Sequence, residues 1–178
     1  MARTEKLEEL ISNDEIQDRA KELAEEIERD YQGREIVIVC VLKGAFIFTA
    51  DLIRYLSLPS QVEFLAVSSY GSSTKSSGVI KIIKDLDVNI QGKDVLLVED
   101  IVDTGLTLNY LKENLKSRGP ESLKICTLLD KPDRREVDIH ADYVGFVIDD
   151  YFVVGYGLDY GENYRNLRGV NLLPEEYI

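Results

Sequence analysis

Residues Val95–Leu108 read VLLVEDIVDTGLTL, and the fold of the chain can be worked out from this stretch. The apolar run at 94–98 is typical of a buried strand, and the pattern over 104–118 predicts a helix. Two adjacent carboxylates, Glu99 and Asp100, stand directly after the strand. A buried strand, a short acidic loop and a helix in this order form one unit of an α/β protein.

The loop inside this stretch carries groups suited to a sugar phosphate. Glu99 and Asp100 at a buried strand end need cations or hydrogen-bond donors, which a vicinal diol or metal-bound water supplies. The helix start at Thr104 offers free N–H groups and a positive dipole end, which bind a phosphate dianion. Gly105 lets the backbone approach closely, and Thr104 and Thr107 add hydroxyl donors. These features together predict a ribose 5-phosphate site.

Each part of this motif also has an ordinary structural interpretation. Asp103 or Thr104 is a suitable helix N-cap, and Glu99-Asp100 can be a solvated turn. Taken singly, these interpretations are the commoner ones. The joint order of apolar strand, Glu-Asp, two apolar residues and Asp-Thr-Gly-x-Thr favours the binding loop. The chain has no GxxxxGK[ST] motif, and no GxGxxG follows a strand.

The rest of the chain alternates between strand and helix patterns, which predicts a central, mostly parallel, twisted sheet flanked by helices. The expected helices are 14–31, 45–57 and 104–118, and the expected strands are 36–42, 62–68, 79–83, 94–98, 123–129, 143–148 and 152–154. Ligands of such sheets bind at the carboxyl ends of the strands. The residues at those ends are Lys43-Gly44, Ser69-Tyr70, 99–107 and Asp130-Lys131.

Length and composition narrow the class of protein. A chain of 178 residues, 44% hydrophobic and 30% charged, is expected to form one globular domain. The longest apolar run, 36–42, is too short to cross a bilayer, and the first ten residues lack the apolar core of a signal peptide, so the cytosol is expected. The net charge of −12 argues against nucleic-acid binding but permits a small phosphorylated ligand. Cys40 and Cys126 lie in apolar runs without zinc-ligand spacing.

Five motifs resemble those of the type I phosphoribosyltransferases, and more closely their hypoxanthine-guanine branch. The motifs are VLKG (41–44), SSYG (68–71), VEDIVDTG (98–105), LLDKP (128–132) and FVVGYGLDYGENYRNL (152–167). The resemblance extends over 36–171, and the last two motifs point to enzymes of 6-oxopurines. It implies a single domain over 1–178, with a core at about 34–150, a hood formed by the N- and C-terminal segments, and a flexible lid loop at about 69–80.

The resemblance implies transfer of ribose 5-phosphate from phosphoribosyl pyrophosphate to N9 of hypoxanthine or guanine. The products are IMP or GMP and pyrophosphate, and Mg²⁺ is the expected cofactor. Asp103 matches the candidate general base near N7 of the purine, and Glu99, Asp100 and Asp159 match Mg²⁺ ligands. The 5′-phosphate loop corresponds to Thr104, Gly105, Leu106 and Thr107, and some relatives carry a lysine at the position of Leu106.

The remaining site residues also come from the resemblance. Lys43, Gly44 and Arg165 match pyrophosphate contacts, and Ser69 and Tyr70 match lid residues. The purine is expected to meet Lys131 at its 6-oxo group, Phe152 against its face, and Val153 and Asp159 at its edge. Taken alone, Lys131 reads as a surface lysine, Phe152 as a core residue and Arg165 as a surface arginine. In the family the turn at Lys43 holds a cis peptide bond, which the sequence leaves open.

Other functions remain open at this point. One is a phosphoribosyltransferase that prefers xanthine, another is an RNA-binding regulatory relative, and a third is a catalytically silent ribose-phosphate-binding module. The acidic charge argues against RNA, and the presence of Asp103 and Lys131 argues against a silent module. No nucleic-acid or membrane partner is expected, and the resemblance implies a homo-dimer or homo-tetramer.

Overall fold

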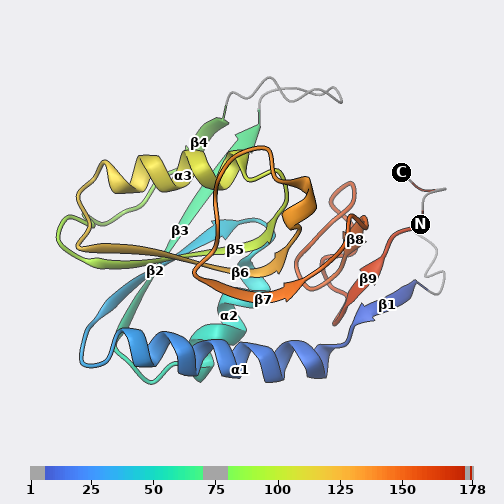
Figure 1. The fold of residues 1–178 in the computed structure, drawn as a ribbon, viewed down its shortest axis with the longest axis horizontal. Helices are drawn as coiled ribbons and strands as arrows, with labels where there is room; N and C mark the ends of the chain where they lie inside the picture. The colour runs from blue at the N-terminus through green and yellow to red at the C-terminus, as the bar shows by residue number, and fades with distance from the viewer. Residues whose placement is uncertain (1–6, 70–79, 175–176, 178) are drawn as a thin grey trace.

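A computed structural model describes residues 7–69, 80–174 and 177 of the chain (Figure 1). Its strands form a six-stranded sheet in the order β4-β3-β2-β5-β6-β7 and a three-stranded sheet in the order β1-β9-β8. The helices are α1 (Asn13–Asp30), α2 (Phe46–Tyr55), α3 (Leu106–Lys116) and the short 3₁₀ helix η1 (Pro132–Arg134). The strands are β1 (Glu8–Ile11), β2 (Ile36–Leu42), β3 (Ser60–Ser69), β4 (Ile80–Lys84), β5 (Asp94–Val102), β6 (Ser122–Asp130), β7 (Tyr143–Val147), β8 (Val153–Val154) and β9 (Val170–Leu172).

The six-stranded sheet confirms the predicted α/β fold. Strands β3, β2, β5, β6 and β7 run parallel, and β4 is antiparallel to β3. The alternation of the sequence between strands and helices leads to this arrangement because each parallel pair needs a crossover connection. The apolar runs of β2 and β5 are buried on both faces, as expected of central parallel strands.

Helices cover both faces of this sheet, with α1 and α2 on one side and α3 on the other (Figure 1). The apolar face of α1 is the predicted one, comprising Ile16, Ala20, Leu23, Ala24 and Ile27. The helix begins with a capping box, in which the side chains of Ser12 and Glu15 bond each other's backbone N–H groups. Cys40 and Cys126 are both buried and free, as their apolar surroundings predicted.

Strand β5 is longer than predicted, and α3 starts later. The expected strand ended at residue 98, but the ladder to β6 continues through Val102, which pairs with Asp130. Ile101 pairs with Leu129, so apolar residues prolong the strand beyond the acidic pair. Gly105 takes the N-cap position of α3 with φ 82°, which delays the helix to Leu106.

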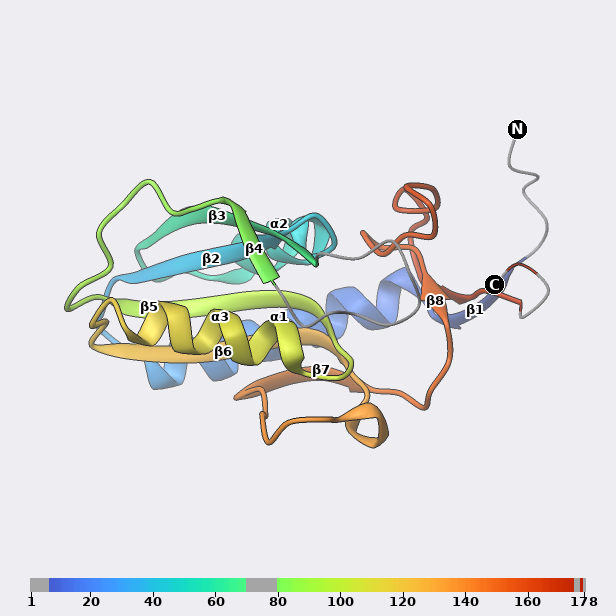
Figure 2. The ribbon, with the colours of Figure 1, turned by 90° about the horizontal axis from the view of Figure 1, so that it is seen from above.

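The small sheet was only partly predicted, since just β8 was expected. Strand β1 pairs antiparallel with β9, and β9 pairs with β8, so the two ends of the chain meet. Figure 2 shows this sheet beyond one end of the central sheet. Of the expected lid at 69–80, residues 70–79 lie outside the described residues, and Ser69 ends β3.

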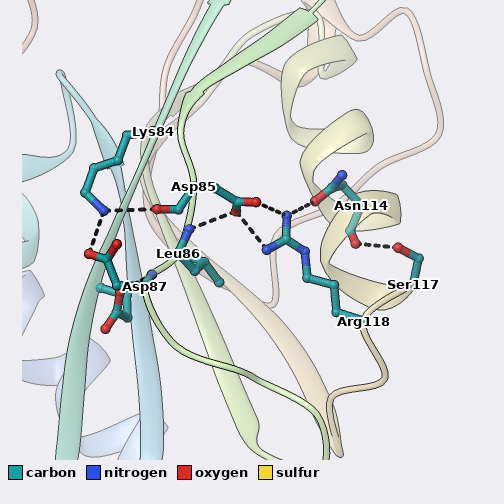
Figure 3. Close-up of polar contacts among 8 residues, drawn as sticks. Lys84, Asp85, Leu86, Asp87, Asn114, Ser117 and Arg118 are labelled. Carbon is teal, nitrogen blue, oxygen red and sulfur yellow. Dashed lines mark hydrogen bonds and ion pairs between the residues drawn. The ribbon is translucent and has the colours of Figure 1, made fainter.

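A polar cluster holds the far end of α3 (Figure 3). Arg118 donates two hydrogen bonds to the Asp85 carboxylate, at 2.7 and 3.0 Å, and a third to Asn114 Oδ1. These bonds tie the segment after β4 to the end of α3. The cluster lies at the C-terminal end of α3, and the loop at Gly105 lies at its N-terminal end. The helix is about 16 Å long, so the two are well separated. Within the described ranges, no helix is long and apolar enough to span a membrane.

Gly145 in β7 leads to a test of the sheet. A Cβ atom at this position would lie 2.4 Å from the carbonyl oxygen of Leu128 in β6. Gly145→Ala should therefore force the two strands apart and lower the free energy of unfolding by about 1–3 kcal/mol. Urea denaturation followed by circular dichroism measures the loss. Val147→Ala, at an exposed position of the same strand, should change stability by less than about 0.5 kcal/mol.

Candidate active site

The carboxyl end of β5 carries the acidic pair that the sequence singled out. Glu99 is buried, and its Oε2 atom has no hydrogen-bond partner among the described residues. Burial and the neighbouring Asp100 raise the pKa of Glu99 well above its ordinary value. Burial also raises the pKa of Asp100 to about 6, although the N–H of Ile101 and the charge of Arg165 oppose the shift. The strand end is thus an acidic site suited to receive donors or a cation.

The turn after β2 lies directly against this pair. The peptide bond between Leu42 and Lys43 is cis. A Cβ atom on Gly44 would lie 1.4 Å from Asp100 Oδ2, and one on Gly157 would lie 2.1 Å from the carbonyl oxygen of Gly44. Glycine avoids a clash at both positions, with the Asp100 side chain at Gly44 and with the Gly44 backbone at Gly157.

The loop between β5 and α3 forms a cavity of about 180 Å³, lined by residues 99–105, Thr107 and Leu108. The segment after η1 forms hydrogen bonds with the backbone of this loop. The N–H of Glu136 donates to the carbonyl oxygen of Thr104 at 2.9 Å, and Arg135 donates to the carbonyl oxygen of Asp103. A Cβ atom on Gly105 would lie 2.6 Å from Ile139 Cγ2, so the loop and this segment pack closely. The cradle predicted for a phosphate is therefore held rigidly at a helix start.

A second, larger cavity of about 680 Å³ lies beside the loop. Its lining brings together three predicted site residues, Asp103, Lys131 and Phe152, from distant parts of the sequence. The remaining lining residues are Glu8, Arg134, Asp150, Tyr151, Leu172, Leu173 and Pro174. The small sheet thus covers the carboxyl end of the large one, and the cavity lies between them.

Lys131 and Phe152 have different environments in this cavity. Lys131 is 6% exposed, so the interpretation as a surface lysine is wrong. Its Nζ donates to the carbonyl oxygen of Tyr151. Phe152 is 41% exposed and packs edge to face on Tyr160, with the ring centroids 5.5 Å apart. It is therefore not a core residue, and its partly exposed side chain lines the cavity.

The predicted pyrophosphate residues form a cluster with two acids. Arg165 Nη2 lies 2.8 Å from Asp159 Oδ1, and Lys43 Nζ lies 2.8 Å from Glu162 Oε2. Arg165 is 20% exposed, so it is not the surface arginine of the ordinary interpretation. The hydrogen bond from Lys43 lowers the pKa of Glu162. This cluster adjoins the acidic pair, because the charges of Arg165 and Asp159 both act on Asp100.

Sequence reasoning missed several charged residues around these cavities. Arg134 and Arg135 belong to the run DKPDRR, which resembles a solvated loop, and Asp150 and Glu162 stand in loops after short strands. The only sequence signal was the position of the run directly after β6, at the edge where ligands bind. The other predicted residues take defined places. Val153 is buried in β8, Ser69 ends β3, and Tyr70 lies outside the described residues.

The acidic pair fits Mg²⁺ by its chemistry. Among the described residues, no group of three or more His, Cys, Asp or Glu side chains is arranged as a metal site. Mg²⁺ usually takes only one or two carboxylates from the protein and completes its shell with water and substrate oxygens. The unpartnered Oε2 of Glu99 provides such an oxygen in a buried position.

Comparison with known proteins agrees with this geometry. The family model of the phosphoribosyl transferase domain matches residues 7–161. The chain belongs to the phosphoribosyl transferase family. This phosphoribosyltransferase is 53% identical over 175 residues to the hypoxanthine-guanine phosphoribosyltransferase of Mycobacterium tuberculosis, covering 94% of this chain and 87% of the relative. It is 54% identical over 164 residues to the enzyme of the same name from Bacillus subtilis, covering 92% and 91%.

A solved structure shows the same fold. The crystal structure of a hypoxanthine-guanine phosphoribosyltransferase from Bacillus anthracis matches with a TM-score of 0.90 at 52% sequence identity. The match covers 94% of this phosphoribosyltransferase and 98% of that chain. The predicted fold class and family resemblance are therefore confirmed.

The acidic pair leads to a test by pH. Because the folded pKa of Glu99 lies above its unfolded value, the protonated form stabilises the fold at low pH. That stabilisation is lost as the pH rises from about 4.5 through the raised pKa. In buffer free of divalent cations, Glu99→Gln should unfold like the wild type near pH 4 and at a higher temperature at pH 7.

Thermal melts between pH 4 and 8 measure this difference. Glu121→Gln, at an exposed position, is the control and should follow the wild type at every pH. A Glu99→Gln protein whose melting temperature stays parallel to the wild type across this range contradicts the raised pKa.

Proposed function

We propose that this phosphoribosyltransferase transfers the 5-phosphoribosyl group of phosphoribosyl pyrophosphate to N9 of hypoxanthine or guanine. The products are IMP or GMP and pyrophosphate, and the reaction serves purine salvage. The observation that carries the proposal is the cavity in which Asp103, Lys131 and Phe152 meet beside the phosphate loop. The names of its relatives, at about half of all positions identical, support the same reaction.

The donor would bind along the carboxyl end of β5. The N–H groups at the start of α3, with the hydroxyls of Thr104 and Thr107, would hold the 5′-phosphate. Leu106 contributes its backbone at the same turn. Glu99 and Asp100 would accept hydrogen bonds from the ribose hydroxyls, directly or through Mg²⁺ and water. The cradle at Gly105 and the acidic pair are on one continuous segment, so the sugar phosphate would be bound at both ends.

The leaving pyrophosphate would lie against the turn after β2. Lys43 and Arg165 supply positive charge there, and Gly44 allows the close approach that a side chain would block. Asp159 contacts Arg165 and would share Mg²⁺ with the pyrophosphate oxygens. When bound, Mg²⁺ neutralises negative charge on the leaving group.

The acceptor base would lie in the larger cavity. Lys131 is a donor without acceptor capacity, so it matches the 6-oxo group of hypoxanthine and guanine and not the 6-amino group of adenine. Phe152 offers a ring face for stacking, and Val153 and Asp159 would contact the edge of the base through their backbone groups. Asp103, which lines the same cavity, would accept the proton from N7.

The chemical step follows from these positions. The bond between C1 of the ribose and the pyrophosphate oxygen breaks, and positive charge develops on the ribose ring. The carboxylates of Glu99 and Asp100 would stabilise this charge through their field. The lone pair of N9 forms the new bond to C1 as Asp103 takes up the N7 proton. A covering lid, expected at Ser69 and Tyr70, would keep water from the ribosyl cation.

We also propose that the enzyme acts in the cytoplasm as a homo-dimer or homo-tetramer and binds neither nucleic acid nor membrane. The resemblance of the sequence to the family supports the oligomer, and the net charge of −12 argues against nucleic acid. Analytical ultracentrifugation gives the number of copies.

A spectrophotometric assay tests the reaction. The protein is mixed with phosphoribosyl pyrophosphate, Mg²⁺ and one of hypoxanthine, guanine, xanthine or adenine. Turnover of hypoxanthine and guanine, absent after addition of EDTA and absent with adenine, is the expected result. A clear preference for xanthine favours the alternative acceptor, and no turnover of any base overturns the proposal.

Replacement of Lys131 tests the acceptor site. Lys131→Ala removes the charged donor to the 6-oxo group and should raise the KM for hypoxanthine and guanine by about 10- to 100-fold. The KM for phosphoribosyl pyrophosphate should change little, because the donor binds at other residues. Steady-state kinetics with each substrate varied in turn separates the two values. Lys93→Ala, an exposed lysine before β5, is the control; unchanged purine KM values in Lys131→Ala contradict the assignment.

A further inference from the structure

We infer that Arg134 and Asp150 form a spacer pair, which keeps Asp103 and Lys131 from binding each other and so leaves room for the purine between them. The inference rests on the proposed function, since it concerns how the base site is held open. Neither residue is predicted by the sequence to act in the reaction. Both are positioning residues, because they act through Asp103 and Lys131.

The sheet register creates the problem that the spacer pair solves. Val102 of β5 and Asp130 of β6 are direct partners in the parallel ladder. Asp103 and Lys131 are the next residues along each strand, and the N–H of Lys131 donates to the carbonyl oxygen of Val102 at 2.9 Å. The ends of two neighbouring strands are thus followed by residues of opposite charge, Asp103 and Lys131. A direct ion pair between them would neutralise both groups that the base requires.

The observed contacts follow another pattern, in which the charges alternate along a chain of four residues. Arg134 Nε donates to Asp103 Oδ1 at 3.1 Å, and Arg134 Nη1 donates to Asp150 Oδ2 at 3.4 Å. Asp150 Oδ1 lies 3.7 Å from Lys131 Nζ. No ion pair joins Asp103 to Lys131 among the described residues. All four side chains line the same cavity.

The shape of arginine explains why this position can serve two acids. A guanidinium group presents its donors in a planar fork, so one side can hold Asp103 while the other holds Asp150. Hydrogen bonding to Asp103 raises the pKa of Arg134 above its ordinary value. Asp150 in turn gives Lys131 an anionic neighbour other than Asp103. Each of the two base-binding groups therefore has its own partner of opposite charge.

Other charged groups near this chain are already engaged. Arg135, which follows Arg134, pairs with Asp130 and donates to the carbonyl oxygen of Asp103. Glu8 also lines the cavity, but its side chain joins none of the three contacts. The alternation therefore depends on Arg134 and Asp150 alone. Removal of Arg134 leaves Asp103, and removal of Asp150 leaves Lys131, without its charged partner. Among the described residues, Lys131 Nζ then keeps only its hydrogen bond to the carbonyl oxygen of Tyr151.

Kinetics of Arg134→Gln, Asp150→Asn and the double variant test the inference. Each single variant should raise the KM for hypoxanthine by about 3- to 10-fold, as for loss of a partly exposed ion pair in a positioning role. The KM for phosphoribosyl pyrophosphate should stay within about twofold. The double variant should resemble either single one, because the spacer fails once one half is lost. Arg134→Lys keeps a positive charge between the two acids and should recover part of the loss.

Arg118→Gln is the matched control, because Arg118 also bonds an aspartate, Asp85, but at the far end of α3 (Figure 3). It should leave both KM values unchanged. An unchanged hypoxanthine KM in Arg134→Gln, equal increases for both substrates, or multiplicative effects in the double variant would overturn the inference. Wild-type turnover of hypoxanthine, measured in the same series, separates these results from a failure of the proposed function.

Discussion

The close approach of the Lys43-Gly44 turn to the acidic end of β5 is the constraint on which the rest of the site depends. Asp100 Oδ2 occupies the volume that any side chain at position 44 would need. The C-terminal loop at Gly157 then lies against the Gly44 carbonyl, so three segments converge on two buried carboxylates. Burial raises the pKa of both acids, which means that the fold holds them in an unfavourable setting. Donors from a sugar and a cation would relieve that setting.

A second constraint is the separation of charges around the larger cavity. Asp103 and Lys131 leave adjacent strands, and parallel pairing places such residues side by side. The intervening contacts of Arg134 and Asp150 give each of them a separate partner. The same segment that carries Arg134 continues to Glu136 and Ile139, which contact the loop between β5 and α3. One short stretch after β6 thus supports the smaller cavity and lines the larger one.

Much of the central fold could be predicted because its signals are local. The apolar face of α1 and the β-branched run of β2 follow from residue spacing alone. The predicted C-terminal end of β5 was wrong, because pairing with β6 continues the strand past the acidic residues. This pairing joins segments that are distant in the sequence. Strands β1 and β9 were missed since each has only three or four residues and forms by pairing with distant segments in the small sheet.

Residue patterns were enough to predict the parallel sheet and the glycine-containing loop before α3, and family motifs pointed to the candidates Asp103, Lys131 and Phe152. These features follow from local patterns of residue type, which can be recognised without knowing which segments pack together in the fold. The folded chain was needed to show that Lys131 is buried, that a side chain at position 44 would collide with Asp100 Oδ2, and that Arg134 and Asp150 contact Asp103 and Lys131. The physical reason is that burial, close approach and ion pairing are relations between segments far apart in the chain, and they arise only when the chain folds.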